Sequence, residues 1–294
     1  MSVVTAPRTR TRRDLLNVFL RVWAVLVYVF LFLPIAVIVA YSFNVGRALI
    51  VWDHFGFESF QAAFDSDTSV SAVQTSLIVA AGSALIATVL GSLAGIALAR
   101  RKGRWTIGFL AFAFLILVTP EIVDAIALLL WYVQIGLFFG PDSPVPALDY
   151  GILRLWVGHS LFSAAVVTLI VRARLEGLDE SLEEAGADLY ATPIRRFFQI
   201  TLPLMLPAVL AGAMLSFSFS LDNVIISSFV NVAGSTPWPV VVFSSIHSTM
   251  RPQVASMSTA LLLLTLTALG LVAFVLRKTG QSTEEVATTL TGAG

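Results

Sequence analysis

Three acidic residues lie within or directly after stretches that are otherwise apolar enough to span a membrane. Glu121 and Asp124 follow the run "TIGFLAFAFLILVTP", and Asp222 follows the run "LPLMLPAVLAGAMLSFSFSL". A charge at the centre of a bilayer costs several kcal/mol, so it normally faces a cavity or a partner. Carboxylates that converge on one cavity would bind a cation, and an ammonium group is a favourable partner for them.

Composition places these residues in a membrane protein. The chain has 294 residues, of which 57% are hydrophobic and 12% charged, and its mean hydropathy is +0.88. A soluble chain of this length needs more polar surface. Its 18 basic and 18 acidic residues balance, which gives no indication of a nucleic-acid partner. Cysteine is absent, so the sequence offers no disulfide, thiolate nucleophile or cysteine metal site, and its three scattered histidines lack metal-ligand spacing.

Six apolar stretches reach the length of about 20 residues that a membrane-spanning helix needs. They lie near Val22–Phe43, Val73–Leu98, Trp105–Val133, Ile152–Val171, Met205–Ile226 and Val254–Leu276. The sequence therefore predicts an all-α, polytopic membrane protein. Its six-span domain covers residues 22–277, between an N-terminal tail of residues 1–21 and a C-terminal tail of residues 278–294.

Basic residues predict the orientation of the spans. Fifteen of the 18 lysines and arginines precede span 1, lie between spans 2 and 3 or between spans 4 and 5, or follow span 6. Only Arg47, Arg154 and Arg251 lie in the alternate connections. The positive-inside rule therefore places both termini in the cytoplasm.

This orientation gives each carboxylate a depth. At about 1.5 Å per residue, Glu121 and Asp222 lie about 24–26 Å from the cytoplasmic starts of their spans, in the outer third of the core. Asp124 lies one turn higher, and Trp131 and Tyr132 lie further out, where they would add cation–π contacts. The alternative is that Glu121 and Asp124 lie near the interface and are simply hydrated. The sequence leaves both interpretations open.

Pro120 interrupts the hydrogen-bond ladder of the third span directly before Glu121. A broken helix there would expose backbone carbonyls to a cavity, as in the half-helices of transporters. A plain kink is the competing interpretation.

Small residues recur along the second predicted span. Gly91 and Gly95 are four residues apart, with Gly82 and Ala87 before them. Such spacing allows a neighbouring helix to approach closely. The neighbour is either a helix of the same chain, which we favour, or a helix of a second subunit.

Between spans 4 and 5 the sequence predicts a helical hairpin over residues 176–203. Its first helix has acidic faces and a narrow apolar stripe formed by Leu175, Leu178, Leu182, Ala185 and Leu189. Thr192 and Pro193 suit the cap and first position of a second helix. Helices that rest on lipid usually carry basic polar faces, whereas an acidic helix with an apolar ridge suits a groove in a protein partner.

The segment "EAGADLYATPIRRFFQITLP" resembles the cytoplasmic signature of permease subunits in binding-protein-dependent ABC importers. The positions that match this signature are Glu184, Ala185, Ile200, Leu202 and Pro203. Two positions depart from it. Gly186 replaces an alanine, and Tyr190 stands where the family has the glycine that ends the first helix, so Thr192-Pro193 would force the turn instead.

The resemblance extends over most of the chain and implies a substrate class. The segments "LPIAVIVAYSFN", "TPEIVDAIALLL" and "LSFSFSLDNVIISSFV" are similar to the second permease of spermidine/putrescine importers. In that family Asp222 corresponds to the first member of an Asp-Asp pair, and Asn223 stands at the second. This substitution removes one negative charge and leaves open whether the substrate is the same.

The family implies a type I ABC importer permease in a bacterial inner membrane. Its expected partners are a second permease, two ATP-binding subunits contacted by the hairpin, and an extracytoplasmic binding protein that delivers a small cationic substrate. This chain has no phosphate-binding loop of the G-x-x-x-x-G-K-[ST] type, so ATP and Mg²⁺ are expected on the partner ATPase, and no cofactor or enzymatic activity on this chain.

Three other functions are open from the sequence. An importer permease for another small solute would have the same architecture. A self-contained secondary transporter usually shows an internal repeat, and none is visible. A membrane enzyme would need a nucleophile and a base, for which only His159 beside Ser160 is a candidate, and a polar helix-packing pair is the simpler interpretation.

Overall fold

The computed structural model describes residues 10–49, 51–101, 103–139, 151–179, 181–248 and 250–278. Within these ranges the regular secondary structure is helical apart from one pair of two-residue strands, so the predicted all-α class is confirmed. Helix α1 (Arg10–Tyr41) begins inside the segment predicted as the N-terminal tail. Residues 1–9 and 279–294, which make up the rest of the predicted tails, lie outside the described ranges.

The chain divides into two compact units, and the first comprises residues 1–65 and 250–260. It contains α1, the antiparallel pair β1 (Asn44–Val45) and β2 (His54–Phe55), α2 (Glu58–Phe64) and the start of α12 (Pro252–Lys278). The buried side chain of Asn44 donates to the carbonyl of Val51 at 2.8 Å and accepts from the N–H of Asp53 at 2.9 Å. Ser256 donates its hydroxyl to the carbonyl of Ser42 at 2.7 Å, which joins α12 to the end of α1.

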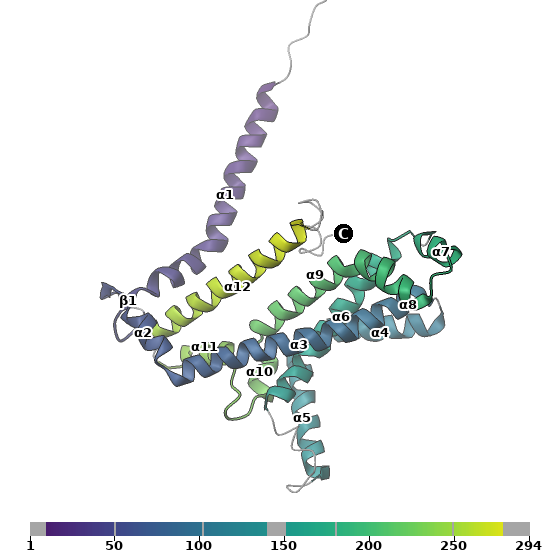
Figure 1. The fold of residues 1–294 in the computed structure, drawn as a ribbon. Coiled ribbons are helices and arrows are strands. Elements are labelled where there is room, and N and C mark those ends of the chain that lie inside the picture. The colour runs from purple at the N-terminus through teal and green to yellow at the C-terminus, as the bar shows by residue number, and fades with distance from the viewer. Residues whose placement is uncertain are drawn as a thin grey trace, which may run out of the picture. The chain divides into compact units, whose positions relative to one another are not determined.

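The second unit comprises residues 66–249 and 261–294 and carries the residues singled out by the sequence. Its helices are α3 (Asp67–Arg100), α4 (Arg104–Val118), α5 (Glu121–Phe139), α6 (Gly151–Glu176), α7 (Ser181–Asp188), α8 (Pro193–Arg196), the π-helix η2 (Phe197–Thr201), α9 (Leu202–Leu221), α10 (Ile225–Val230), α11 (Trp238–Ile246) and the rest of α12. Helices α3, α6 and α9 pack against one another and form its centre (Figure 1).

Glycines allow α3 and α6 to pack this closely. A Cβ atom on Gly91 would lie 2.7 Å from the Cβ of Val167 and 2.8 Å from the carbonyl oxygen of Ala164. On Gly95 it would lie 2.9 Å from the carbonyl oxygen of Thr168. The small-residue stripe therefore packs against a helix of the same chain, as we favoured from the sequence.

Four helices among the described residues are long and apolar enough to cross a membrane. They are Leu16–Tyr41 within α1, α3, α6 and the continuous stretch Pro193–Leu221. The bent pair α4 and α5 makes a fifth, and the apolar part of α12, Pro252–Ala268, is shorter. The predicted count of six spans therefore remains a prediction.

The third predicted span is not one straight helix. Helices α4 and α5 meet at a bend of 102° around Thr119 and Pro120. Thr119 has an extended backbone, with ψ at 129°, because the proline ring disfavours a helical conformation in the residue before it. Of the two interpretations that the sequence left open, the structure has the helix break.

The fifth predicted span differs at both of its ends. It begins earlier, because α8, η2 and α9 run on without interruption from Pro193 to Leu221. It also ends earlier, because the chain leaves the helix at Asp222 and enters α10 only at Ile225. What we predicted as a separate second helix of the hairpin is therefore the first part of the helix that ends at Asp222.

The surroundings of Gly91 and Gly108 predict different effects on stability when each is replaced by alanine. Gly91→Ala should lower the stability of the purified protein by about 1–3 kcal/mol, because the new methyl group meets the backbone of α6. Gly108→Ala, in α4, should leave stability unchanged or raise it by up to about 1 kcal/mol, because nothing lies within 4 Å of the added atom. Thermal unfolding in detergent compares the two variants, and equal shifts would contradict the predicted contact between α3 and α6.

Candidate functional site

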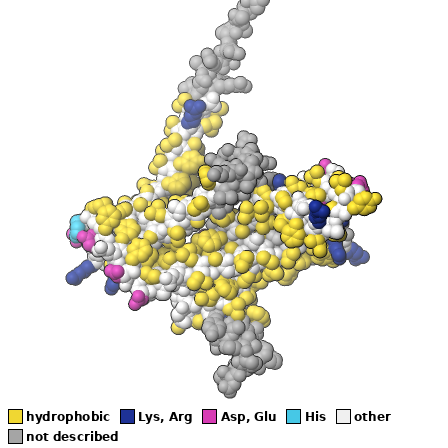
Figure 2. Space-filling view, viewed as in Figure 1, with side chains coloured by type: hydrophobic (Ala, Val, Ile, Leu, Met, Phe, Trp, Pro, Cys, Tyr) yellow, Lys and Arg dark blue, Asp and Glu magenta, His cyan; other side chains and the backbone are white. Residues whose placement is uncertain are grey.

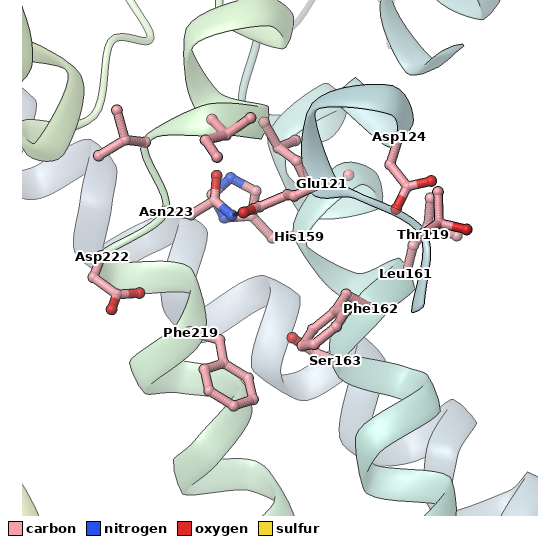
Figure 3. Close-up of a pocket in the computed structure, with 14 residues that line it drawn as sticks. Thr119, Glu121, Asp124, His159, Leu161, Phe162, Ser163, Phe219, Asp222 and Asn223 are labelled. Atoms are coloured by element: carbon pink, nitrogen blue, oxygen red, sulfur yellow. Dashed lines mark hydrogen bonds between the residues drawn. The ribbon is translucent and has the colours of Figure 1, made fainter. Parts of the chain in front are cut away.

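The broken helices converge on a cavity of about 360 Å³. Its wall is formed where α4 passes into α5 and α9 into α10, together with the middle of α6. The lining residues with side chains of chemical interest are Thr119, Glu121, Asp124, His159, Phe162, Phe219, Asp222 and Asn223 (Figure 3). All of the predicted acidic residues therefore line one space.

Each carboxylate owes its position to a helix end. Glu121 and Asp124 lie in the first turn of α5, where the helix dipole favours negative charge. Asp222 is the residue at which α9 ends, and it lies across the view from Asp124 in Figure 3. No lysine or arginine is among the described residues that line the cavity, so its charge is negative.

Asn223 connects the two broken helices. Its side-chain amide donates to the carboxylate of Glu121, and its amide oxygen accepts from the N–H of Ser227 at 3.1 Å. The polar contacts of Asp222 are different: within the described part of the chain no other side chain contacts its carboxylate, and the side chain is exposed. Asp222 is therefore the carboxylate most available to a ligand.

His159 lies in the cavity wall and is buried. Its Nδ1 is 2.7 Å from the hydroxyl of Ser220 in α9, and its Nε2 is 3.0 Å from the hydroxyl of Ser227 in α10. The neighbouring Ser160 instead donates to the carbonyl of Val157 at 3.0 Å. His159 thus joins the two sides of the α9–α10 break, as the helix-packing interpretation requires, and does not pair with Ser160.

The two aromatic residues that we expected beside the cation do not reach the cavity. Trp131 is half exposed, and the buried Tyr132 donates its hydroxyl to the carbonyl of Arg154 at 2.9 Å, while the Arg154 guanidinium lies 5.2 Å from the Tyr132 ring centroid. The bend at Pro120 directs α5 away from the axis of α4, so depth along one straight helix does not apply. Phe162 and Phe219 line the cavity instead, with ring centroids 5.7 Å apart.

The hairpin, residues 181–201, lies at the end of this unit that carries most of its basic residues (Figure 2). These residues are Arg100, Arg101, Arg104, Arg172, Arg174, Arg195 and Arg196.

The carboxylate of Asp179 accepts a hydrogen bond from the N–H of Ser181 at the start of α7, at 2.9 Å, and this bond lowers the pKa of Asp179.

Tyr190 adopts the conformation for which the family has its glycine. Its φ is +57°, in the left-handed region. The N–H of Tyr190 donates to the carbonyl of Ala187 at 2.9 Å, and the N–H of Ala191 donates to that of Gly186 at 3.1 Å. This pair of bonds is a Schellman motif. The turn is therefore kept despite the substitution, and Thr192-Pro193 only begins the next helix, with the Thr192 hydroxyl accepting from the N–H of Arg195.

The signature residues divide into a packed set and an exposed set. Gly186 is buried beneath Ile200, whose Cδ1 would lie 2.8 Å from a Cβ atom at that position. Leu202 is half-buried, and Glu184, Ala185 and Pro203 are exposed. Four apolar side chains of the hairpin are exposed, namely Leu182 and Leu189 of the predicted apolar stripe together with Ile194 and Phe198.

Residues 87–281 match the family described as the inner membrane component of binding-protein-dependent transport systems. The putrescine transport system permease protein PotI of Escherichia coli K12 is 38% identical over 84% of this chain and 85% of its own length. The spermidine/putrescine transport system permease protein PotC of Haemophilus influenzae is 33% identical over 86% of this chain and 94% of its own.

The fold is similar to that of chains in solved ABC transporters. A chain of a bacterial ABC transporter that imports the acidic polysaccharide alginate superposes with a TM-score of 0.72 at 12% identity, over 92% of this chain and 98% of that one. A chain of an amino acid ABC transporter gives a TM-score of 0.52 at 18% identity, over 76% of this chain and 96% of that one. The family match and the 38% identical relative show that this chain belongs to the inner membrane components of binding-protein-dependent transport systems.

Proposed function

We propose that this chain is a permease subunit of an ATP-driven importer that carries a polyamine of the putrescine or spermidine class. The observation that supports it most strongly is the cavity in which Glu121, Asp124 and Asp222 meet with no basic side chain among its described lining residues. Relatives that are 38% and 33% identical are named as putrescine and spermidine/putrescine permeases.

The chemistry of the cavity suits a linear diamine. Each ammonium group of such a substrate can form charge-assisted hydrogen bonds with a carboxylate. The methylene chain between the ammonium groups would pack against Phe162 and Phe219, whose ring faces also attract cations. Asn223 already donates to Glu121, so Asp222 and Asp124 offer the carboxylates without a described side-chain partner.

The same proposal assigns the partners and the orientation. The basic end of the second unit faces the cytoplasm by the positive-inside rule, and with it both termini. Two ATP-binding subunits, which hold ATP and Mg²⁺, dock on the hairpins of this chain and of a second permease. An extracytoplasmic binding protein delivers the substrate to the opposite side.

Alternating access then uses the continuity of the helix from Pro193 to Leu221. When the ATPase subunits close, they move the hairpin, and the first residues of that helix move with it. A helix of this length spans roughly 40 Å, so motion at the hairpin reaches Asp222 at its other end. Substrate enters from the outside in one state and leaves toward the cytoplasm in the other.

The assignment of Asp222 predicts a loss of uptake when its charge is removed. In cells that lack the gene, Asp222→Asn should restore uptake of labelled putrescine and spermidine about 10- to 100-fold less efficiently than the wild type, because a charge-assisted contact is lost. Asp65→Asn, in the first unit and outside the cavity, is the matched control. Normal polyamine uptake in the deletion strain, with no redundant importer, would contradict the substrate and leave the importer architecture in place.

Because the ring of Tyr190 is exposed, its removal should weaken docking of the ATPase subunits without lowering the stability of this chain. Tyr190 is 96% exposed and in a left-handed conformation that costs a non-glycine residue roughly 1–2 kcal/mol. Tyr190→Gly should therefore unfold no earlier than the wild type, yet bind the ATPase subunits about tenfold more weakly, because an aromatic anchor is removed. Tyr190→Phe keeps the ring and should bind normally. Equal affinity of the glycine variant, measured by co-purification at graded concentrations, would exclude Tyr190 as a contact.

A further inference from the structure

Glu183 contacts three parts of the second unit at once. Its carboxylate forms an ion pair with the guanidinium of Arg100, the last residue of α3. The same oxygen accepts a hydrogen bond from the hydroxyl of Thr201, the last residue of η2, at 2.6 Å. Its backbone carbonyl accepts from Arg196 of α8 at 3.3 Å. A single side chain of α7 is thereby attached to the ends of α3 and η2.

These contacts are shielded from solvent more than an ordinary surface ion pair. The side chains of Arg100 and Glu183 are 30% and 26% exposed, and Thr201 is buried. Exposed ion pairs contribute little, whereas partial burial and a shared hydrogen bond make a pair depend on its geometry. The adjacent Glu184, the acidic residue of the family signature, is exposed and has no such contact among the described residues.

Thr201 lies in the turn through which the hairpin continues into α9. The α-helical ladder changes to a π-helix over Phe197–Thr201, and the N–H of Leu202 donates to the carbonyl of Phe197 five residues earlier. Pro203 has no N–H to donate to the carbonyl of Gln199, so the α-helical pattern cannot simply continue through this turn. Single π-helical turns are frequent at functional sites. Glu183 therefore holds α7 at the joint where the hairpin passes into α9.

We propose that Glu183 is a positioning residue that fastens α7 to α3 and to the base of α9, so that these helices move with the hairpin. The proposal rests on the proposed function, because it requires that an ATPase moves the hairpin. Glu184 is exposed to solvent, whereas Glu183 transmits the movement of the hairpin to α3 and α9. Without this attachment α7 still packs against α8 and η2, where Gly186 lies beneath Ile200, but it loses its ion pair with α3.

A charge exchange tests the attachment in the assembled transporter. Glu183→Arg and Arg100→Glu are each made alone and then together, in complex with the second permease and the ATPase subunits in proteoliposomes. Each single variant should keep ATP hydrolysis but move about tenfold less putrescine per ATP, and the double variant should regain most of the loss. Exchange of the Arg172–Glu176 pair, which lies within α6, is the matched control and should change nothing.

A second readout does not depend on the substrate. The chain has no cysteine, so spin labels can be placed at Ala187 in α7 and Leu206 in α9. The distance distribution between them should be narrow in the wild type with and without ATP, broad in each single variant, and narrow again in the double variant. Unchanged distributions in the single variants would overturn the attachment, and broadened distributions with normal transport per ATP would overturn its role in coupling. Failure of the wild type to transport putrescine would instead count against the proposed substrate.

Discussion

A carboxylate cannot rest in hydrocarbon, and the second unit is organised around this constraint. Glu121, Asp124 and Asp222 are tolerated because two helices break where these residues lie. A break exposes backbone groups that no water in the bilayer core can satisfy, so it must be enclosed by other protein. Helix α6 supplies that enclosure, and one cavity serves both the broken backbone and the charges.

Polar side chains in the cavity wall hold the two helix breaks in place. His159 bonds Ser220 on one side of the α9–α10 break and Ser227 on the other, and Ser227 in turn donates its N–H to Asn223. Asn223 reaches Glu121 across the space between the two broken helices. The network fixes Glu121 and leaves Asp222 without a described side-chain partner, which separates a structural carboxylate from one that can meet a ligand.

The acidic residues of the cavity could be singled out from the sequence, whereas its aromatic residues could not. Apolar runs that end directly before Glu121 and Asp222 sufficed to single out both carboxylates, which line one cavity, because a charge beside an apolar run is a local signal. Trp131 and Tyr132 are not among the residues that line the cavity, because the chain bends at Pro120. A proline in the sequence shows that the helical hydrogen-bond ladder is interrupted, but not by what angle the chain turns. Phe162 and Phe219 meet only through the packing of α6 against α9, and no spacing along the chain reveals that contact.

The contacts of the hairpin could also not be predicted from the sequence, although the segment carries a family signature. Matching Glu184, Ile200 and Pro203 to the family identified the segment, but the motif could not say which acidic residue faces inward. That depends on Arg100, which is distant in sequence and is brought beside Glu183 only because glycines let α3 pack closely on α6. The close packing of α3 on α6 thus places Arg100, the last residue of α3, beside the hairpin, where it can pair with Glu183.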